Sequence, residues 1–363
     1  MRRVLLFLCA AGAMAEMRPL FNGRNLEGWV HEGSRATFTA AEGEIRTSGL
    51  GNHPNWLRTV AEYENFRLEF DYKLARWAEA AVILRAPARG RPMNAGLAVM
   101  LAHDFHGTRD AWVTGGIPGA LPPRAALLAS WGAWHKASIL LDGDRLTAAI
   151  DGVTVQEADL AAHPDLRRRL KRGFIGFPDL GHAWAVRNVR IEDLGFRHKV
   201  VDLFDGRSLK GWSLRGAGNW SVREGSIYGA NGHGILYAAP AFENFELTLL
   251  ARSRNRANGG VFLRGQPEGP ERGFEVQIYS PPDSVYPTGS IYGIERARAA
   301  ADFEDRWFLM QVIVEGGACI VRLDGDTVAR SEQVETRKPG RIGLQIHSDG
   351  ASLEFRDVRV RPL

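Results

Sequence analysis

A short segment near residue 277 alternates polar and apolar side chains whose types are suited to chemistry. Glu275, Gln277 and Tyr279 are two positions apart, with Val276 and Ile278 between them. Residues two apart share one face of a β-strand, so the first three project together while the two aliphatic side chains face a core. Such a face presents a carboxylate that can move a proton, an amide that can bind hydroxyl groups, and a ring.

Two further segments show the same alternation. Gln345 and His347 stand opposite to their aliphatic neighbours, as do Phe262 and Arg264. If these strands lie side by side, a carboxylate, amides, an imidazole, a guanidinium and aromatic rings converge on one surface. A carbohydrate site uses these groups for hydroxyls and for C–H patches. The other interpretation is that polar side chains simply alternate outward on a solvated sheet.

The chain that must position these residues contains an internal repeat. Residues 21–29 (FNGRNLEGW) recur 183 positions later as residues 204–212 (FDGRSLKGW). Further matches follow in the same order: 42–45 with 224–227, 63–66 with 242–245, 82–85 with 261–264, 114–117 with 288–291 and 187–189 with 356–358. We therefore expect two tandem copies of one domain, residues 17–195 and 199–363.

Within each copy the hydrophobic period is two. Short apolar or alternating runs are bounded by Gly, Asp-Gly and Pro, which is typical of strands and turns. Asp324-Gly325 and Asp151-Gly152 mark hairpins at corresponding places. Segments with a helical period are almost absent outside residues 158–171. The pattern predicts an all-β fold of two tandem antiparallel β-sandwiches.

The first copy is an internal control for the polar face. When Gly96 is aligned with Gly273, the polar positions of the second copy become apolar, and only Arg85 survives, opposite Arg264. The replacements are Ala98 for Glu275, Met100 for Gln277, Ala102 for Tyr279, Pro178 for Gln345 and Leu180 for His347. We therefore expect the second copy to hold the site, and the first, degenerate copy to support or dock it.

Composition and charge exclude several classes of function. The chain has 363 residues, 45% hydrophobic and 24% charged, with 41 Gly and a formal net charge of +4, which disfavours disorder and a nucleic-acid partner. Its one basic run, residues 167–172, is interpreted as a solvated face. No phosphate loop, HExxH motif, paired cysteine ligands or GxSxG elbow is present.

The N-terminal segment predicts export from a bacterial cell. Arg2 and Arg3 precede an apolar run, residues 4–11, and then Ala13-Met14-Ala15, which has the form that a signal peptidase accepts. We expect cleavage after Ala15 and a periplasmic or extracellular protein. The apolar run is too short to span a membrane. Cys319 then remains as the mature cysteine, and its apolar strand predicts a buried, inert thiol.

In their order, the motifs of the second copy resemble the 3-keto-disaccharide hydrolase domain family. They are LFDG (203–206), ENFEL (243–247), NGGVFLR (258–264), GFEVQI (273–278), TGSIY (288–292) and LQIH (344–347). The resemblance covers the second copy end to end and the first more weakly. It implies a concanavalin A-like jelly-roll sandwich whose concave sheet binds a sugar, with Asn258 among the sugar-binding residues. Tyr279 departs from the pattern, because an Asp is common there.

The resemblance implies a reaction that this face can support. An ordinary glycosidase needs two carboxylates, and the face offers only Glu275. A ketone at C3 acidifies the C2 proton, so one base can drive β-elimination of the C1 leaving group, followed by addition of water. Glu275 or His347 is the expected base. Arg264, Gln277 and Gln345 would hold the sugar or polarise the ketone, and Tyr292 would assist the leaving group.

Two alternatives use the same face without a reaction. A noncatalytic, lectin-like carbohydrate-binding module needs the polar face but no tuned base. An adhesion module would use the tandem sandwiches as spacers and the face as a protein contact. No cofactor is expected: Ca²⁺ is known in other jelly-roll proteins, but no acidic cluster here has suitable ligand spacing. The expected partner is a carbohydrate, with a separate oxidoreductase as a source of the 3-keto sugar.

Overall fold

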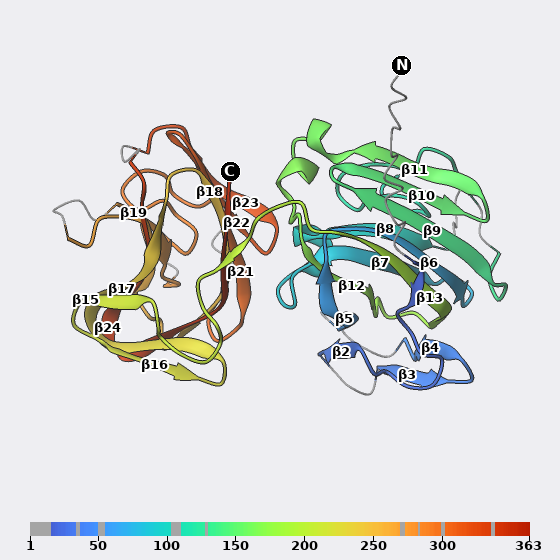
Figure 1. Ribbon diagram of the computed structural model, residues 1–363, viewed down its shortest axis with the longest axis horizontal. Coiled ribbons are helices and arrows are strands. Elements are labelled where there is room, and N and C mark those ends of the chain that lie inside the picture. The colour runs from blue at the N-terminus through green and yellow to red at the C-terminus, as the bar shows by residue number, and fades with distance from the viewer. Residues whose placement is uncertain are drawn as a thin grey trace, which may run out of the picture.

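The structure is a computed structural model that describes residues 16–33, 37–49, 55–102, 110–127, 130–268, 273–281, 284–298, 302–334 and 338–363 (Figure 1). The expected signal peptide, residues 1–15, lies outside the described residues. The helices of the described part are short: α1 (Pro92–Ala95), η1 (Leu160–Ala162) and η2 (Leu166–Arg168). None of them is long and apolar enough to cross a membrane.

Two sheets form the first sandwich within the described residues. One sheet has the order β11-β10-β9-β6-β13-β4-β3, with β1 beside β13, and the other has the order β2-β5-β12-β7-β8. The first sheet contains β1 (Arg18–Pro19), β3 (Phe38–Ala41), β4 (Glu44–Thr47), β6 (Asn65–Leu74), β9 (His135–Asp142), β10 (Arg145–Ile150), β11 (Val153–Asp159) and β13 (Trp184–Gly195). The second contains β2 (Trp29–Glu32), β5 (Trp56–Tyr63), β7 (Glu79–Ala86), β8 (Leu97–Ala102) and β12 (Gly173–Pro178).

The second sandwich is built around two long strands, β17 (Ser226–Phe242) and β24 (Gly340–Pro362), which pair with each other along most of their length. The first half of β24 pairs with β19, and its second half pairs with β18, so it runs through both layers. The other strands are β14 (Val201–Asp202), β15 (Trp212–Gly216), β16 (Asn219–Arg223), β18 (Phe245–Arg254), β19 (Gly259–Gly265), β20 (Phe274–Ile278), β21 (Phe308–Glu315), β22 (Ala318–Leu323) and β23 (Asp326–Ser331).

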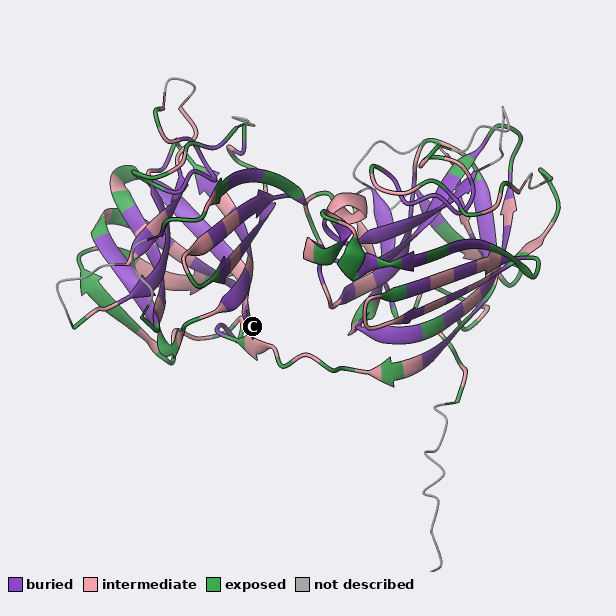
Figure 2. Ribbon diagram, turned by 90° about the horizontal axis from the view of Figure 1, so that it is seen from above, coloured by how far each residue is buried: buried purple, intermediate pink, exposed green. Residues whose placement is uncertain are grey.

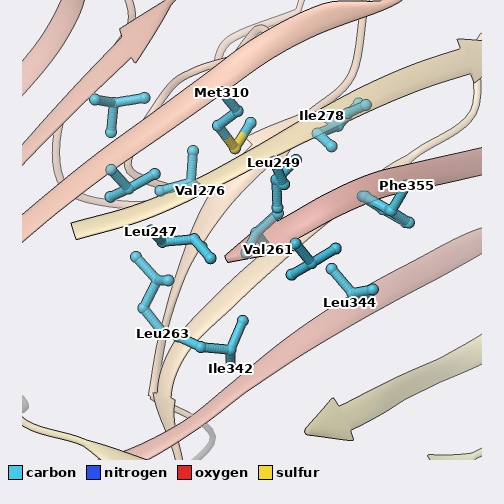
Figure 3. Packing of buried hydrophobic residues seen from close by; sticks show 14 of the residues in the cluster. Leu247, Leu249, Val261, Leu263, Val276, Ile278, Met310, Ile342, Leu344 and Phe355 are labelled. Carbon is cyan, nitrogen blue, oxygen red and sulfur yellow. The ribbon is translucent and has the colours of Figure 1, made fainter. Parts of the chain in front are cut away.

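Each sandwich has its own apolar core, seen as buried ribbon inside both halves of the molecule (Figure 2). In the second sandwich, Val261, Val276 and Leu344 point from β19, β20 and β24 toward Leu249 and Met310 on the opposite layer (Figure 3). These residues occupy every second position of their strands, as the alternation predicts. The all-β fold of two tandem jelly-roll sandwiches is thus confirmed. Cys319 is buried in this core, where burial raises its thiol pKa to about 12.

The interpretation of residues 167–172 as a solvated face is wrong. The Arg169 side chain is 5% exposed and donates to the carbonyls of Met93 (3.1 Å) and Gly96 (3.2 Å), which ties the loop to α1. The Arg168 carbonyl accepts hydrogen bonds from the buried side chains of Arg322 (2.6 Å) and Gln311 (2.7 Å) in the second sandwich. The basic run is therefore part of the contact between the two domains, where its backbone groups find partners.

Candidate functional site

The register of three neighbouring strands creates a grid of side chains on the outer face of the second sandwich. β19 lies between β24 and β20, so Phe262 stands beside Glu275 on one side and Gly343 on the other. One row further along the strands, Gly260 lies between Gln277 and Gln345. The structure therefore places side by side the strands whose polar faces were expected to converge.

A third row closes the grid at its far end. The backbone N–H of His347 donates to the Asn258 carbonyl at 2.8 Å. On the other side, His347 pairs in register with His233 of β17, and their rings meet edge to face with centroids 4.3 Å apart. Ideal sheet spacings of about 4.8 Å between strands and 3.3 Å per residue put the Cα atoms of Glu275 and His347 roughly 16 Å apart. These two side chains thus occupy opposite corners of the grid.

The grid forms the floor of a cavity of about 640 Å³, a size typical of small-molecule sites. Seven of the nine residues predicted to act in the site line it: Asn258, Phe262, Glu275, Gln277, Tyr292, Gln345 and His347. Gly273, Phe274, Gly293, Ile294 and Gln333 complete the described lining. The described lining thus includes one carboxylate and one imidazole, and no lysine or arginine.

Glu275 is partly buried at one end of this cavity. Burial raises the pKa of its carboxyl to about 7, because the charged form loses hydration there. A Cβ atom built on Gly260 would overlap the Glu275 carboxylate and lie 2.6 Å from the Val276 carbonyl oxygen, so the space that Glu275 occupies exists only above a glycine. A carboxyl group with this pKa can exchange a proton near neutral pH.

The Gln277 amide connects the carboxylate to the rest of the polar face. In one orientation its Nε2 donates to Asn258 Oδ1 at 3.3 Å. In the opposite orientation, which satisfies both ends of the amide, Nε2 donates to Glu275 Oε1 at 3.2 Å and to the Gly259 carbonyl at 2.7 Å. Gln277 is 5% exposed, so the amide is held in place rather than solvated. The Gln277 amide thus donates to Asn258 in one orientation and to Glu275 in the other.

A tight turn stands beside Glu275 at the rim. The Tyr292 backbone N–H donates to the Glu275 carbonyl at 2.9 Å, and Ile291 forms bridges with Val276 and Glu295. Tyr292 is 54% exposed, and its ring centroid lies 5.1 Å from that of Tyr286. The turn therefore holds an aromatic ring at the end of the cavity where the carboxylate lies.

The expectation that Arg264 faces the sugar is wrong. Its fully buried guanidinium donates to the carbonyls of Glu243 and Gly316, both at 2.7 Å, and it does not line the cavity. The β24 register shifts between Phe262 and Gly265, and Arg264 has a φ of 53°, so the alternation of faces fails there. Arg85 has the same backbone conformation and binds the Glu64 carbonyl at 2.5 Å. An arginine stands at this position in both copies, although only the second copy has the polar face, and this was the sequence signal for a structural role.

Tyr279 also lies outside the cavity lining. β20 ends at Ile278, and the Tyr279 backbone N–H donates to Thr288 Oγ1 at 3.0 Å instead of continuing the ladder with β19. The alternation that grouped Tyr279 with Glu275 thus stops one residue earlier. His233, Ile294 and Gln333 were missed by the sequence interpretation, because they lie on β17 and in loops that only the fold brings to this face.

The corresponding face of the first sandwich is filled by apolar side chains. Ile83 pairs with Ala98 as Phe262 pairs with Glu275, and Ala81 pairs with Met100 as Gly260 pairs with Gln277. Met93 of α1 packs onto this face from outside. A smaller cavity of about 330 Å³ remains, with Trp56, Met93 and Leu180 in its wall. The first sandwich thus has the same register without the polar floor.

The described residues include no group of three or more His, Cys, Asp or Glu side chains able to hold a metal ion. What the cavity offers is proton transfer by a carboxyl group, hydrogen bonding by four amides and an imidazole, and ring contacts at the rim.

Comparison with family models matches residues 16–192 and 199–361 to the 3-keto-alpha-glucoside-1,2-lyase-like domain. Among solved structures, a protein from Parabacteroides distasonis ATCC 8503 that is provisionally assigned as a glycosyl hydrolase is 20% identical, with a TM-score of 0.43 over 49% of this chain and 94% of its own. The carbohydrate-binding module CBM66 from Bacillus subtilis is 15% identical, with a TM-score of 0.34 over 46% of this chain and 96% of its own. No curated protein matches the sequence.

Proposed function

The chain belongs to the 3-keto-alpha-glucoside-1,2-lyase-like domain family, and on this premise we propose that the cavity of its second domain cleaves glycosides whose sugar unit carries a ketone at C3. The observation that carries the proposal is a single, partly buried carboxyl group of raised pKa in a polar cavity. A two-carboxylate glycosidase mechanism has no second acid in the described lining.

The reaction is a proton abstraction next to a carbonyl group. The ketone makes the C2–H bond acidic, and Glu275 takes that proton while the electron pair moves into an enolate. The enolate then re-forms the ketone, which creates a C1=C2 bond and breaks the bond from C1 to the glycosidic oxygen. The leaving oxygen takes the proton that Glu275 accepted, and the carboxylate is regenerated. Later addition of water to the unsaturated sugar makes the net result a hydrolysis.

Glu275 is the base in this proposal, rather than His347. Its pKa of about 7 keeps a substantial basic fraction at neutral pH. The backbone of Tyr292 is hydrogen-bonded to that of Glu275, and both side chains line the cavity, so a leaving group can bind at this turn. His347 lies at the opposite corner of the grid. We assign to it, with Gln345 and Asn258, the binding of hydroxyl groups and of the oxygen on which enolate charge develops.

The test is incubation of the protein with 3-keto-trehalose and other 3-keto glucosides, with the unoxidised glucosides as matched controls, followed by mass spectrometry of the released sugar. Release from the keto sugars alone is expected. Glu275→Gln is expected to abolish release, while His347→Gln slows release without abolishing it, because the base remains in place. If Glu275→Gln retains turnover, the assignment of the base is wrong.

A binding titration with the same sugars, beside the release experiment, separates the enzyme from the binding alternatives. Affinity for the sugars without release from any of them would place the protein with lectin-like modules, since such modules need the polar floor but no base. A protein with neither affinity nor turnover would fit an adhesion role. We also propose that the first domain, residues 17–195, docks and supports the second, residues 199–363, without cleaving sugar itself.

The proposed substrate implies a place in a sequence of reactions. A glucoside with an ordinary C3 hydroxyl has no acidic C2–H, so a separate oxidoreductase must install the ketone. We further propose that the protein is exported after removal of residues 1–15 and meets its substrate in the periplasm or outside the cell. Mass determination of the protein recovered from cell fractions tests the cleavage after Ala15.

A further inference from the structure

The geometry of the rim points to the leaving group. We propose that Tyr292 and Ile294, braced by Tyr286, form the subsite for the leaving group and select glycosides whose aglycone is planar and aromatic. This inference rests on the proposed cleavage of 3-keto glycosides at the same cavity. It names a substrate class that the family description leaves open.

Apolar side chains are exposed at the mouth of this polar cavity. Tyr292 and Ile294 line the cavity and are 54% and 39% exposed. Tyr286 packs against Tyr292 with an interplanar angle of 54°, which fixes the direction of the Tyr292 ring. Exposed apolar groups collected at the mouth of a pocket mark a surface that a ligand covers.

The turn that carries Tyr292 and Ile294 is attached to the strand of the proposed base. The hydrogen bond from the Tyr292 backbone to the Glu275 carbonyl, together with the bridge between Ile291 and Val276, ties the turn to the strand that carries Glu275. A base that removes the C2 proton lies next to C1, to which the leaving group is bound. The leaving group therefore extends past Glu275 toward the turn, while the sugar hydroxyls lie over the amides.

The first sandwich contains the same turn. Ile117 bridges Leu121 as Ile291 bridges Glu295, and Gly119 has the same left-handed conformation as Gly293, with φ of 70° and 73°. At the positions of Tyr292 and Ile294, this turn carries Pro118 and Ala120. The large apolar side chains therefore occur only in the copy that has the carboxylate, although the backbone of the turn does not require them.

The chemistry of these side chains favours an aromatic aglycone over a second sugar. A tyrosine ring and a branched aliphatic chain offer dispersion contact and ring stacking to a planar apolar group. A sugar in the same place needs hydrogen-bonding partners for its hydroxyl groups, since burial of an unpaired hydroxyl is unfavourable. Two amides of the described lining, Asn258 and Gln333, lie outside the strands, and Asn258 is at the far end of the grid beside His347.

Isothermal titration calorimetry with unoxidised glucosides tests this subsite without any turnover. The probes are 4-nitrophenyl and methyl glucosides, each as the α and β anomer, and the proteins are the wild type, Tyr292→Ala, Tyr292→Phe and Ile294→Ser. The wild type is expected to bind the aryl glucoside of the preferred anomer roughly three- to tenfold more tightly than its methyl counterpart. In Tyr292→Ala the ratio of aryl to methyl affinity is expected to fall close to one. It is expected to fall less in Ile294→Ser and to stay unchanged in Tyr292→Phe.

Equal affinity of the wild type for aryl and methyl glucosides would overturn the inference. An equal loss of affinity for the aryl and methyl glucosides in Tyr292→Ala would also overturn it. So would a loss of aryl preference in Tyr292→Phe as large as in Tyr292→Ala, because the effect would then belong to the hydroxyl group. The proposed function fails separately, by an absence of release from any 3-keto glucoside. Release from 3-keto methyl glucosides without an aryl preference would leave the function standing and remove the aromatic subsite.

Discussion

Gly260 lies directly beneath the carboxylate of Glu275, on the neighbouring strand and in the adjacent row of the grid. The absence of a side chain at Gly260 creates the space in which this carboxylate is held among the strands, away from water. Desolvation in that space is the cause of its raised pKa. A backbone position without any chemistry of its own thus determines where the proposed base sits.

A methyl group at this position is expected to displace the base. Gly260→Ala should lower kcat/KM for a 3-keto glucoside at least tenfold, because misplacement of a catalytic group by about 1 Å has an effect of that order. The matched control is Gly343→Ala on the same face, where the methyl group would meet Ile235 Cγ2 at 2.6 Å and Tyr237 Cε1 at 2.8 Å, away from Glu275. If Gly260→Ala and Gly343→Ala lower the Tm by similar amounts and also lower kcat/KM equally, this role of Gly260 is contradicted.

The pH dependence of turnover should report the same carboxyl group. A base must be deprotonated to act, and burial raises the pKa of Glu275 to about 7. The kcat/KM for a 3-keto glucoside is therefore expected to rise tenfold per pH unit below about 7 and to level off above it. A profile that levels off already near pH 5 would show that a group with an ordinary carboxyl pKa is the base.

Stability should follow the opposite trend with pH. Between the ordinary glutamate pKa of 4.5 and the raised pKa of about 7, the Glu275 carboxyl binds a proton in the folded protein that the unfolded chain has released. Stability from this group is therefore lost as pH rises through that range. Glu275→Gln is expected to match the wild-type Tm near pH 4.5 and to exceed it by roughly 3 °C or more at pH 8. An equal difference in Tm at both pH values would exclude this linkage.

Arg264 should matter for folding and not for sugar binding. Its guanidinium donates to two backbone carbonyls from inside the domain, and Arg264→Ala leaves those acceptors without these donors. A loss of about 3 kcal/mol in the free energy of unfolding is expected. If the alanine variant does not fold, Arg264→Lys, which keeps the charge, replaces it in the binding measurement. The folded variant should bind methyl glucoside like the wild type, and a selective loss of sugar affinity would restore Arg264 to the site.

The contact between the domains should depend on Arg322. This side chain is fully buried and donates to the Arg168 carbonyl at 2.6 Å and to Asp165 Oδ1 at 2.8 Å across the interface. Arg322→Ala is expected to cost about 3 kcal/mol and to separate the unfolding transitions of the two domains in calorimetry. The control is Arg330→Ala, which removes an exposed pair with Glu332 and should change stability by about 0.5 kcal/mol or less.

Much of the site was predictable because strand periodicity is a local property. Glu275 and Gln277 share a face of one strand, and Gln345 and His347 share a face of another, so each pair follows from the alternation alone. The prediction failed for Arg264 and Tyr279, where a bulge and a strand end interrupt the alternation. His233 and Ile294 have no such local signal, because one lies on a long strand that changes layers and the other in a turn.

The amino-acid sequence by itself determined the repeat, the all-β fold and the polar faces of the strands, since each depends on the spacing of residue types along the chain. Only the tertiary structure decided which faces meet, that Arg264 is buried away from them, and that residues 167–172 lie in the contact between the domains. The physical reason is that burial and pairing arise from residues far apart in sequence. The pKa of Glu275 is the clearest case, because burial in the folded domain raises it and the carboxylate lies over Gly260 of the neighbouring strand.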